Sequence, residues 1–155
     1  MTKKLIVGII MAGLLFQGMI PATAEALWGS SPEKLVPKEG ALRIPVDTIS
    51  GQARFFEVAA ADGTTVTFFV VKSRDGVIRT ALNACDVCYE AGKGYAQQGE
   101  YMVCLNCGRR FLLERVNAVS GGCNPVSLGN RIEKGEVVIF MKDINDTTRY
   151  FKNVK

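Results

Sequence analysis

The chain has 155 residues, enough for one domain with a hydrophobic core, and a formal net charge of +4. This mild and evenly spread charge does not indicate a protein that binds nucleic acid. The chain contains no histidine, which excludes histidine-ligated haem, two-histidine Rieske clusters, mixed Cys/His zinc sites and Ser-His or Cys-His catalytic pairs.

Residues 1–24 have the three parts of a secretory signal peptide. Lys3 and Lys4 precede an apolar run over residues 5–20, and Ala22-Thr23-Ala24 offers small residues for cleavage. The run is shorter than the roughly 20 residues that span a bilayer, so a retained anchor is the second interpretation. We therefore expect an exported protein, in the periplasm or on the outer face of the inner membrane.

Beyond the signal peptide, residues 25–40 read as a linker, because glycine, serine and proline alternate with charges there. A cysteine-rich metal-binding domain is expected over residues 41–155. Its first half is rich in Val, Ile, Phe and Thr and contains two Asp-Gly turns, which predict a meander leading into Cys85. The expected strands cover residues 42–46, 53–58, 65–71 and 77–82.

The second half predicts a short strand over residues 110–116 and a final hairpin over residues 132–141. Residues 143–151 predict one or two helical turns, capped by Asp143 or Asn145. The fold class is therefore mainly β, a small barrel or sandwich with two Cys-x-x-Cys knuckle loops.

Four of the five cysteines form two Cys-x-x-Cys pairs with fifteen residues between them: Cys85, Cys88, Cys104 and Cys107. In each pair, two intervening residues allow both sulfurs to point to one side of a tight turn. Two such turns facing each other make a four-sulfur cage, which suits zinc, mononuclear iron or an iron–sulfur cluster. Gly108 suits a backbone that folds tightly past the last sulfur.

Two other interpretations of the pairs stay open. Each pair is also the motif of a redox dithiol, although such a dithiol needs its first cysteine at a helix N-terminus. In an oxidising compartment clustered cysteines also form structural disulfides. The cage is the preferred interpretation.

Cys123 is the fifth cysteine and lies in Gly121-Gly122-Cys123-Asn124-Pro125, the sequence of a fixed loop. It is a candidate extra or alternative metal ligand, a partner for another thiol, or an inert buried cysteine.

Aromatic and basic residues near the cysteines have simpler expected roles. The adjacent pairs Phe55-Phe56 and Phe68-Phe69 cannot direct all four rings to one face of a sheet, so one member of each is expected against another layer or a partner surface. Arg109 and Arg110 follow the second knuckle and either stabilise thiolate charge, dock an acidic partner or stay solvated.

The sequence resembles the FtrD-like membrane iron–sulfur family of bacterial ferrous-iron uptake systems. The most specific matching stretches, within about residues 43–151, are Asp75-Gly76, Ala84 to Tyr89, Lys93 to Tyr95, Cys104 to Gly108 and Gly121 to Pro125. The resemblance implies a metal or iron–sulfur domain facing the periplasm and four knuckle cysteines as its ligands. It also implies an iron permease and a periplasmic iron-binding protein as partners, with the inner membrane surface nearby.

The order of strands, knuckles and closing hairpin is also similar to that of Rieske-type domains, with cysteine at both histidine positions. In such a fold, all-thiolate ligation of a two-iron cluster predicts a lower potential than a Rieske centre has.

Three functions follow from these observations. The first is an iron or iron–sulfur redox protein that transfers electrons in ferrous-iron uptake, and therefore not an enzyme in its own right. The second is a structural or docking module that holds zinc or another soft metal, and the third is a thiol–disulfide oxidoreductase. The Lys-Lys start indicates export in an unfolded state, which favours a metal acquired after export. The redox function is the leading hypothesis.

Overall fold

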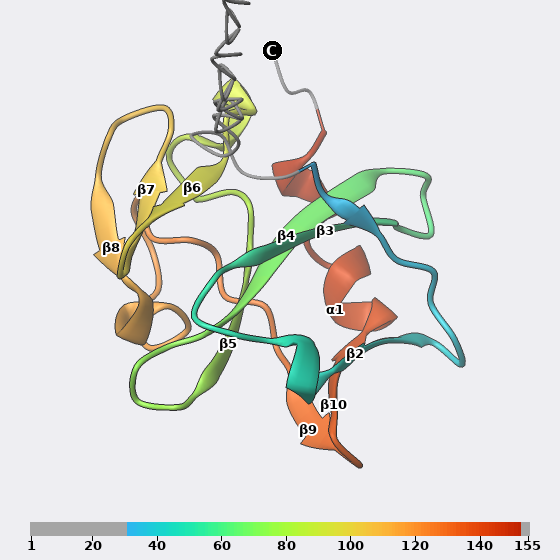
Figure 1. Ribbon diagram of the computed structural model, residues 1–155. Helices are drawn as coiled ribbons and strands as arrows, with labels where there is room; N and C mark the ends of the chain where they lie inside the picture. The colour runs from blue at the N-terminus through green and yellow to red at the C-terminus, as the bar shows by residue number, and fades with distance from the viewer. Residues whose placement is uncertain (1–30, 153–155) are drawn as a thin grey trace, which may run out of the picture.

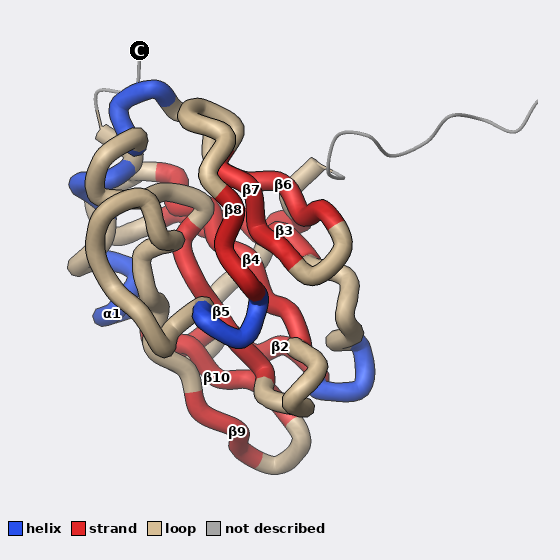
Figure 2. The backbone as a smooth tube through the Cα atoms, turned by 90° about the vertical axis from the view of Figure 1, so that its left-hand side faces the viewer, coloured by secondary structure: helices blue, strands red, loops and turns tan. Residues whose placement is uncertain are grey.

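The computed structural model describes residues 31–152, so the predicted signal peptide lies outside the described residues. The fold is mainly β, as predicted, and is built from three small sheets (Figure 1). Their strand orders are β1-β3-β4-β5, β2-β10-β9 and β6-β7-β8. Figure 2 shows the four-stranded sheet between the two smaller ones. The similarity to Rieske topology stays a prediction.

The four-stranded sheet contains the predicted meander. Its strands are β1 (Glu33–Lys34), β3 (Arg54–Ala59), β4 (Thr65–Lys72) and β5 (Ile78–Leu82). Strands β3, β4 and β5 pair antiparallel, and both Asp-Gly turns lie where the sequence places them. Strand β1 lies inside the segment interpreted as a linker and pairs parallel with β3.

The second sheet pairs a strand from the beginning of the described chain with two strands from near its end. Its strands are β2 (Ala41–Pro45), β9 (Arg131–Glu133) and β10 (Glu136–Phe140), and β9 and β10 form the predicted final hairpin. Helix α1 (Met141–Asn145) follows β10 directly. The predicted caps Asp143 and Asn145 are wrong, because the helix begins two residues before Asp143 and has no side-chain cap.

The third sheet was not predicted as a unit. Its strands are β6 (Tyr95–Gln98), β7 (Tyr101–Cys104) and β8 (Arg110–Leu112), so a hairpin occupies most of the sequence between the two knuckles. The strand predicted over residues 110–116 ends early and turns into a 3-10 helix, Leu113–Arg115. The short strands β6 and β8 show little hydrophobic alternation in the sequence. Both are stabilised by antiparallel pairing with β7.

Two separate cores lie on the two faces of the four-stranded sheet. Phe56 and Phe68 stack with ring centroids 5.5 Å apart in the first core, which also contains the second sheet and α1. Phe55 and Phe69 pack at 5.8 Å in the second core, together with Cys85 and Cys104. The prediction that neighbouring rings point to different layers is confirmed, and the second core supports the cysteines.

Candidate metal centre

The first knuckle begins just after β5. Strand β5 ends at Leu82, and Cys85 is buried three residues later. The backbone N–H of Cys88 donates to the Cys85 sulfur at 3.1 Å, the arrangement expected when a tight turn directs its amides at a sulfur. A 3-10 helix, Tyr89–Ala91, follows and ends at Gly92 in the left-handed conformation.

The second knuckle is the connection between β7 and β8. The N–H of Cys104 donates to the Arg109 carbonyl at 2.9 Å, and the N–H of Gly108 donates to the Cys104 carbonyl at 2.8 Å. Gly108 has a φ of 72°, a conformation that glycine adopts without steric cost. The tight turn past the last sulfur, predicted from Gly108, is therefore present.

A third segment brings Cys123 to the knuckles. After the 3-10 helix Leu113–Arg115 the chain returns to the end of β5, where the N–H of Val126 donates to the Ala84 carbonyl at 3.0 Å. Cys123 is half-buried and its sulfur lies 3.9 Å from the Cys88 sulfur. All five cysteines of the chain thus belong to one neighbourhood, and all five are free thiols.

The five sulfurs form two triads that share Cys88. The inner triad is Cys85, Cys88 and Cys104, and the outer triad is Cys88, Cys107 and Cys123; within each, the sulfurs lie within 4.8 Å of one another. Cys85 and Cys104 are each 2% exposed, whereas Cys107 is exposed. The four cysteines predicted from the sequence are therefore divided between two triads that share Cys88, and the fifth cysteine belongs to the outer triad.

The thiols differ in pKa, and the outer triad contains both a raised and a lowered value. Burial raises the pKa of the Cys104 thiol to about 11 and that of Cys123 to about 12. The backbone N–H of Arg109 is the main cause that lowers the pKa of Cys107 to about 7. Arg109 therefore stabilises the thiolate through its backbone, and the Arg110 guanidinium lies over the Tyr101 ring instead.

This donor set fits a metal. Sulfur is the preferred ligand of iron–sulfur clusters, of zinc and of other soft ions, and the site supplies several thiols with backbone N–H groups directed at them. Both knuckles lie fully within the described residues, and neither pair begins an α-helix. The requirement of a thioredoxin-type dithiol is therefore not met here.

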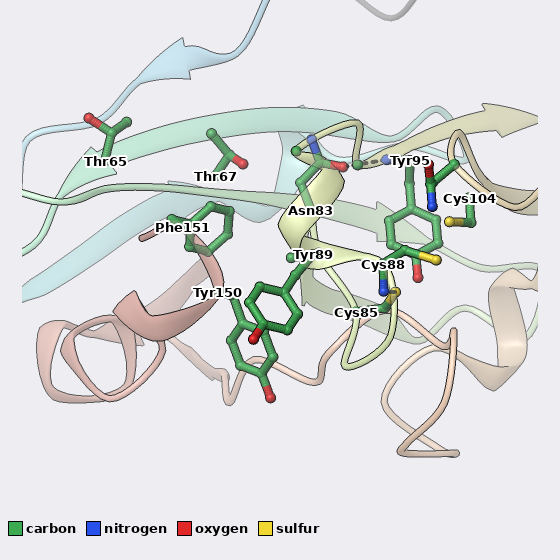
Figure 3. A pocket seen from close by; sticks show the side chains of 14 residues that line it. Thr65, Thr67, Asn83, Cys85, Cys88, Tyr89, Tyr95, Cys104, Tyr150 and Phe151 are labelled. Atoms are coloured by element: carbon green, nitrogen blue, oxygen red, sulfur yellow. Dashed lines mark hydrogen bonds between the residues drawn. The ribbon is translucent and has the colours of Figure 1, made fainter. Parts of the chain in front are cut away.

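A pocket of about 240 Å³ opens onto the inner sulfurs. Figure 3 shows Tyr89 and Tyr150 in contact at one part of it and the cysteines around Tyr95 at another. The rings of Tyr89 and Tyr150 meet edge to face at 5.5 Å, and the Tyr150 hydroxyl donates to Asp86 at 2.6 Å. Because Asp86 lies inside the first knuckle, this hydrogen bond ties the end of the described chain to the knuckle.

Tyr95, which the sequence indicated only as the end of one stretch that resembles the family, lies among the inner sulfurs. It is 4% exposed, and its backbone N–H donates to the Asn83 side-chain oxygen at 2.7 Å. Burial is the main cause, and the neighbouring Cys85 the next, that raises the pKa of the Tyr95 hydroxyl far above the usual range. The hydroxyl therefore stays protonated and can donate a hydrogen bond. In the sequence, the only sign that Tyr95 is a buried hydrogen-bond donor among the cysteines is an aromatic residue after a glycine between the two knuckles.

Replacing Gly94 with alanine is expected to cost about 1–3 kcal/mol more stability than replacing Gly99 with alanine. Both glycines have positive φ, 64° and 58°, so both substitutions share a backbone penalty of about 1–2 kcal/mol. Only at Gly94 does an added Cβ meet another group, the Asn83 amide at 2.5 Å, which its bond to Tyr95 holds in place. Urea unfolding of the metal-free chain measures the difference, and equal losses would contradict the packing argument.

Comparison with known families identifies the chain. Residues 49–151, which include both knuckles and Cys123, match the family described as membrane iron-sulfur containing protein FtrD-like. This match covers more than half of the sequence. The chain belongs to the FtrD-like family. The predicted resemblance is thereby confirmed.

The other comparisons add two findings. No curated protein and no solved structure matches this FtrD-like chain at a significant level. Among the described residues 31–152, no helix is long and apolar enough to cross a membrane.

Proposed function

We propose that this FtrD-like protein is an exported electron-transfer accessory of ferrous-iron uptake, which holds iron or an iron–sulfur centre on Cys85, Cys88, Cys104 and Cys107. One observation carries the proposal. The cysteine sulfurs form a continuous group that extends from the buried Cys85 and Cys104 to the exposed Cys107. Family membership, with iron–sulfur in the family description, supports iron over other soft metals.

In the proposed centre, some cysteines hold the metal inside the core and one presents it at the surface. Cys85 and Cys104 are buried in the second core, the core that also contains Phe69, and this core keeps water from both sulfurs. Cys107 lies at the surface of the second knuckle, where a partner protein can approach. When bound, an iron or iron–sulfur group supplies one-electron transfer, and all-sulfur ligation keeps its potential low.

The proposed partners follow from the same family. An FtrD-like domain that works in ferrous-iron uptake acts beside an iron permease and a periplasmic iron-binding protein. The predicted export signal supports the proposal that the domain lies on the same side of the inner membrane as the iron-binding protein. No nucleic acid is expected among the partners, given the mild charge of the chain.

Purification from the native compartment tests the proposal. We expect iron, with or without labile sulfide, and a visible spectrum that changes on chemical reduction. A colourless protein that contains zinc alone would contradict the redox function and support the structural alternative. Metal-free protein with two disulfides by mass would contradict both kinds of metal centre.

A further inference from the structure

The Cys123 segment is held in place by its own backbone. Both the N–H and the side-chain amide of Asn124 donate to the Gly121 carbonyl, at 3.3 and 2.9 Å. Gly121 has a φ of 87°, which suits glycine. On the far side, the N–H of Leu82 donates to the Val126 carbonyl at 2.8 Å. The loop is therefore tied to the end of β5, the strand that leads into the first knuckle.

Tyr95 adds a second anchor from β6. Its hydroxyl donates to the carbonyl of Cys123 itself at 2.5 Å. The Tyr95 ring is buried and packs edge to face against Phe111 at 6.3 Å. The backbone of Cys123 is consequently fixed relative to β5, which leads into Cys85, and to β6, where Tyr95 pairs with Cys104 of β7.

The sulfur separation has the value that a shared metal ion requires. Two thiolates on a tetrahedral ion with metal–sulfur bonds of about 2.3 Å lie roughly 3.8 Å apart. The Cys88 and Cys123 sulfurs are 3.9 Å apart, and a disulfide bond has a length of only about 2.05 Å. Cys107 completes the outer triad within 4.8 Å.

We propose that Cys123 is a metal ligand on the outer side of the centre and that Tyr95 is the residue that positions it. The inference rests on the proposed metal centre and adds a fifth sulfur to it. The exposed side then has three thiols for a thiophilic ion, Cys88, Cys107 and Cys123. Cys107 and Cys123 are then the ligands that belong to the outer side alone, whereas Cys85 and Cys104 are the two fully buried thiols.

Alkylation of the full-length protein, metal-free and then saturated anaerobically with cobalt(II), tests this ligand set. Peptide mass mapping after iodoacetamide treatment gives the reaction rate of each cysteine. We expect cobalt(II) to slow alkylation of Cys123 at least about tenfold, as it does for Cys107, because a metal-bound thiolate is withdrawn from reaction. The absorbance of the sulfur-to-cobalt charge-transfer bands is expected to fall in Cys123→Ser.

Tyr95→Phe tests the positioning role. Loss of one hydrogen bond is expected to raise the alkylation rate of cobalt-loaded Cys123 about fivefold and to leave Cys104 protected. Tyr101→Phe is the matched control, because it removes a phenol hydroxyl from the adjacent strand β7, where the ring packs against Arg110. Equal effects of the two variants on Cys123 would overturn the positioning role.

The remaining outcomes separate this inference from the proposed function. If cobalt(II) protects the four knuckle cysteines and leaves the rate at Cys123 unchanged, the fifth ligand is disproved and the four-cysteine centre stands. If cobalt(II) protects none of the cysteines, the metal centre itself is disproved.

Discussion

Replacing Cys88 with serine is expected to lower the metal affinity of the full-length protein by more than about 100-fold, since even outer-shell changes cost about 10–100-fold. Cys88 is the one cysteine common to both sulfur triads. Its loss therefore weakens the inner and the outer side of the centre together. Metal content after desalting, followed by competition with a chromogenic chelator, measures the loss.

Val87→Ser is the matched control for that experiment. Val87 precedes Cys88 in the same knuckle and is 64% exposed, so the variant introduces the same hydroxyl side chain without removing a sulfur. We expect Val87→Ser to bind metal as the unmodified protein does. Full metal content in Cys88→Ser would show that Cys88 is not a ligand and would refute the shared-sulfur description.

Replacing Phe69 with alanine is expected to destabilise the metal-free protein by about 3–5 kcal/mol, because the ring is completely buried. Phe69 packs in the same core as Cys85 and Cys104. We therefore expect this variant to weaken metal binding as well as stability. Urea unfolding and chelator competition, performed on the same preparations, separate the two effects.

Phe68 provides the matched control, as its neighbour on β4 with no exposed surface. Its ring lies in the other core, stacked on Phe56. Phe68→Ala is expected to cost a similar amount of stability and to leave the metal affinity of the folded protein much less changed. If the alanine variants do not fold, Phe69→Leu and Phe68→Leu provide the same comparison at a smaller cost, because leucine leaves a smaller cavity than alanine. Equal losses of metal affinity would contradict the assignment of two separate cores.

The sequence by itself determined much of the strand content. The Val, Phe and Thr residues around the Asp-Gly turns predicted β3, β4 and β5, and the hairpin predicted over residues 132–141 became β9 and β10. These elements follow from local backbone preferences and a period of two, which a single sequence displays directly. The Cys-x-x-Cys spacing likewise determined two tight turns that direct their amides at sulfur.

The tertiary structure decided which residues meet. The hairpin of β6 and β7 has too weak a local pattern to predict, and it is the pairing of Tyr95 with Cys104 that places a buried tyrosine among the sulfurs. Cys123 is separated from Cys107 by a strand, a 3-10 helix and a glycine-rich loop, so no spacing rule could join them. Hydrogen bonds from Val126 and Tyr95 bring it there. The sequence thus determined two knuckles and an all-sulfur site, because ligand types and short turns are local properties. Only the packing of distant segments decided that the site has five sulfurs, with Cys88 shared between its buried and exposed sides.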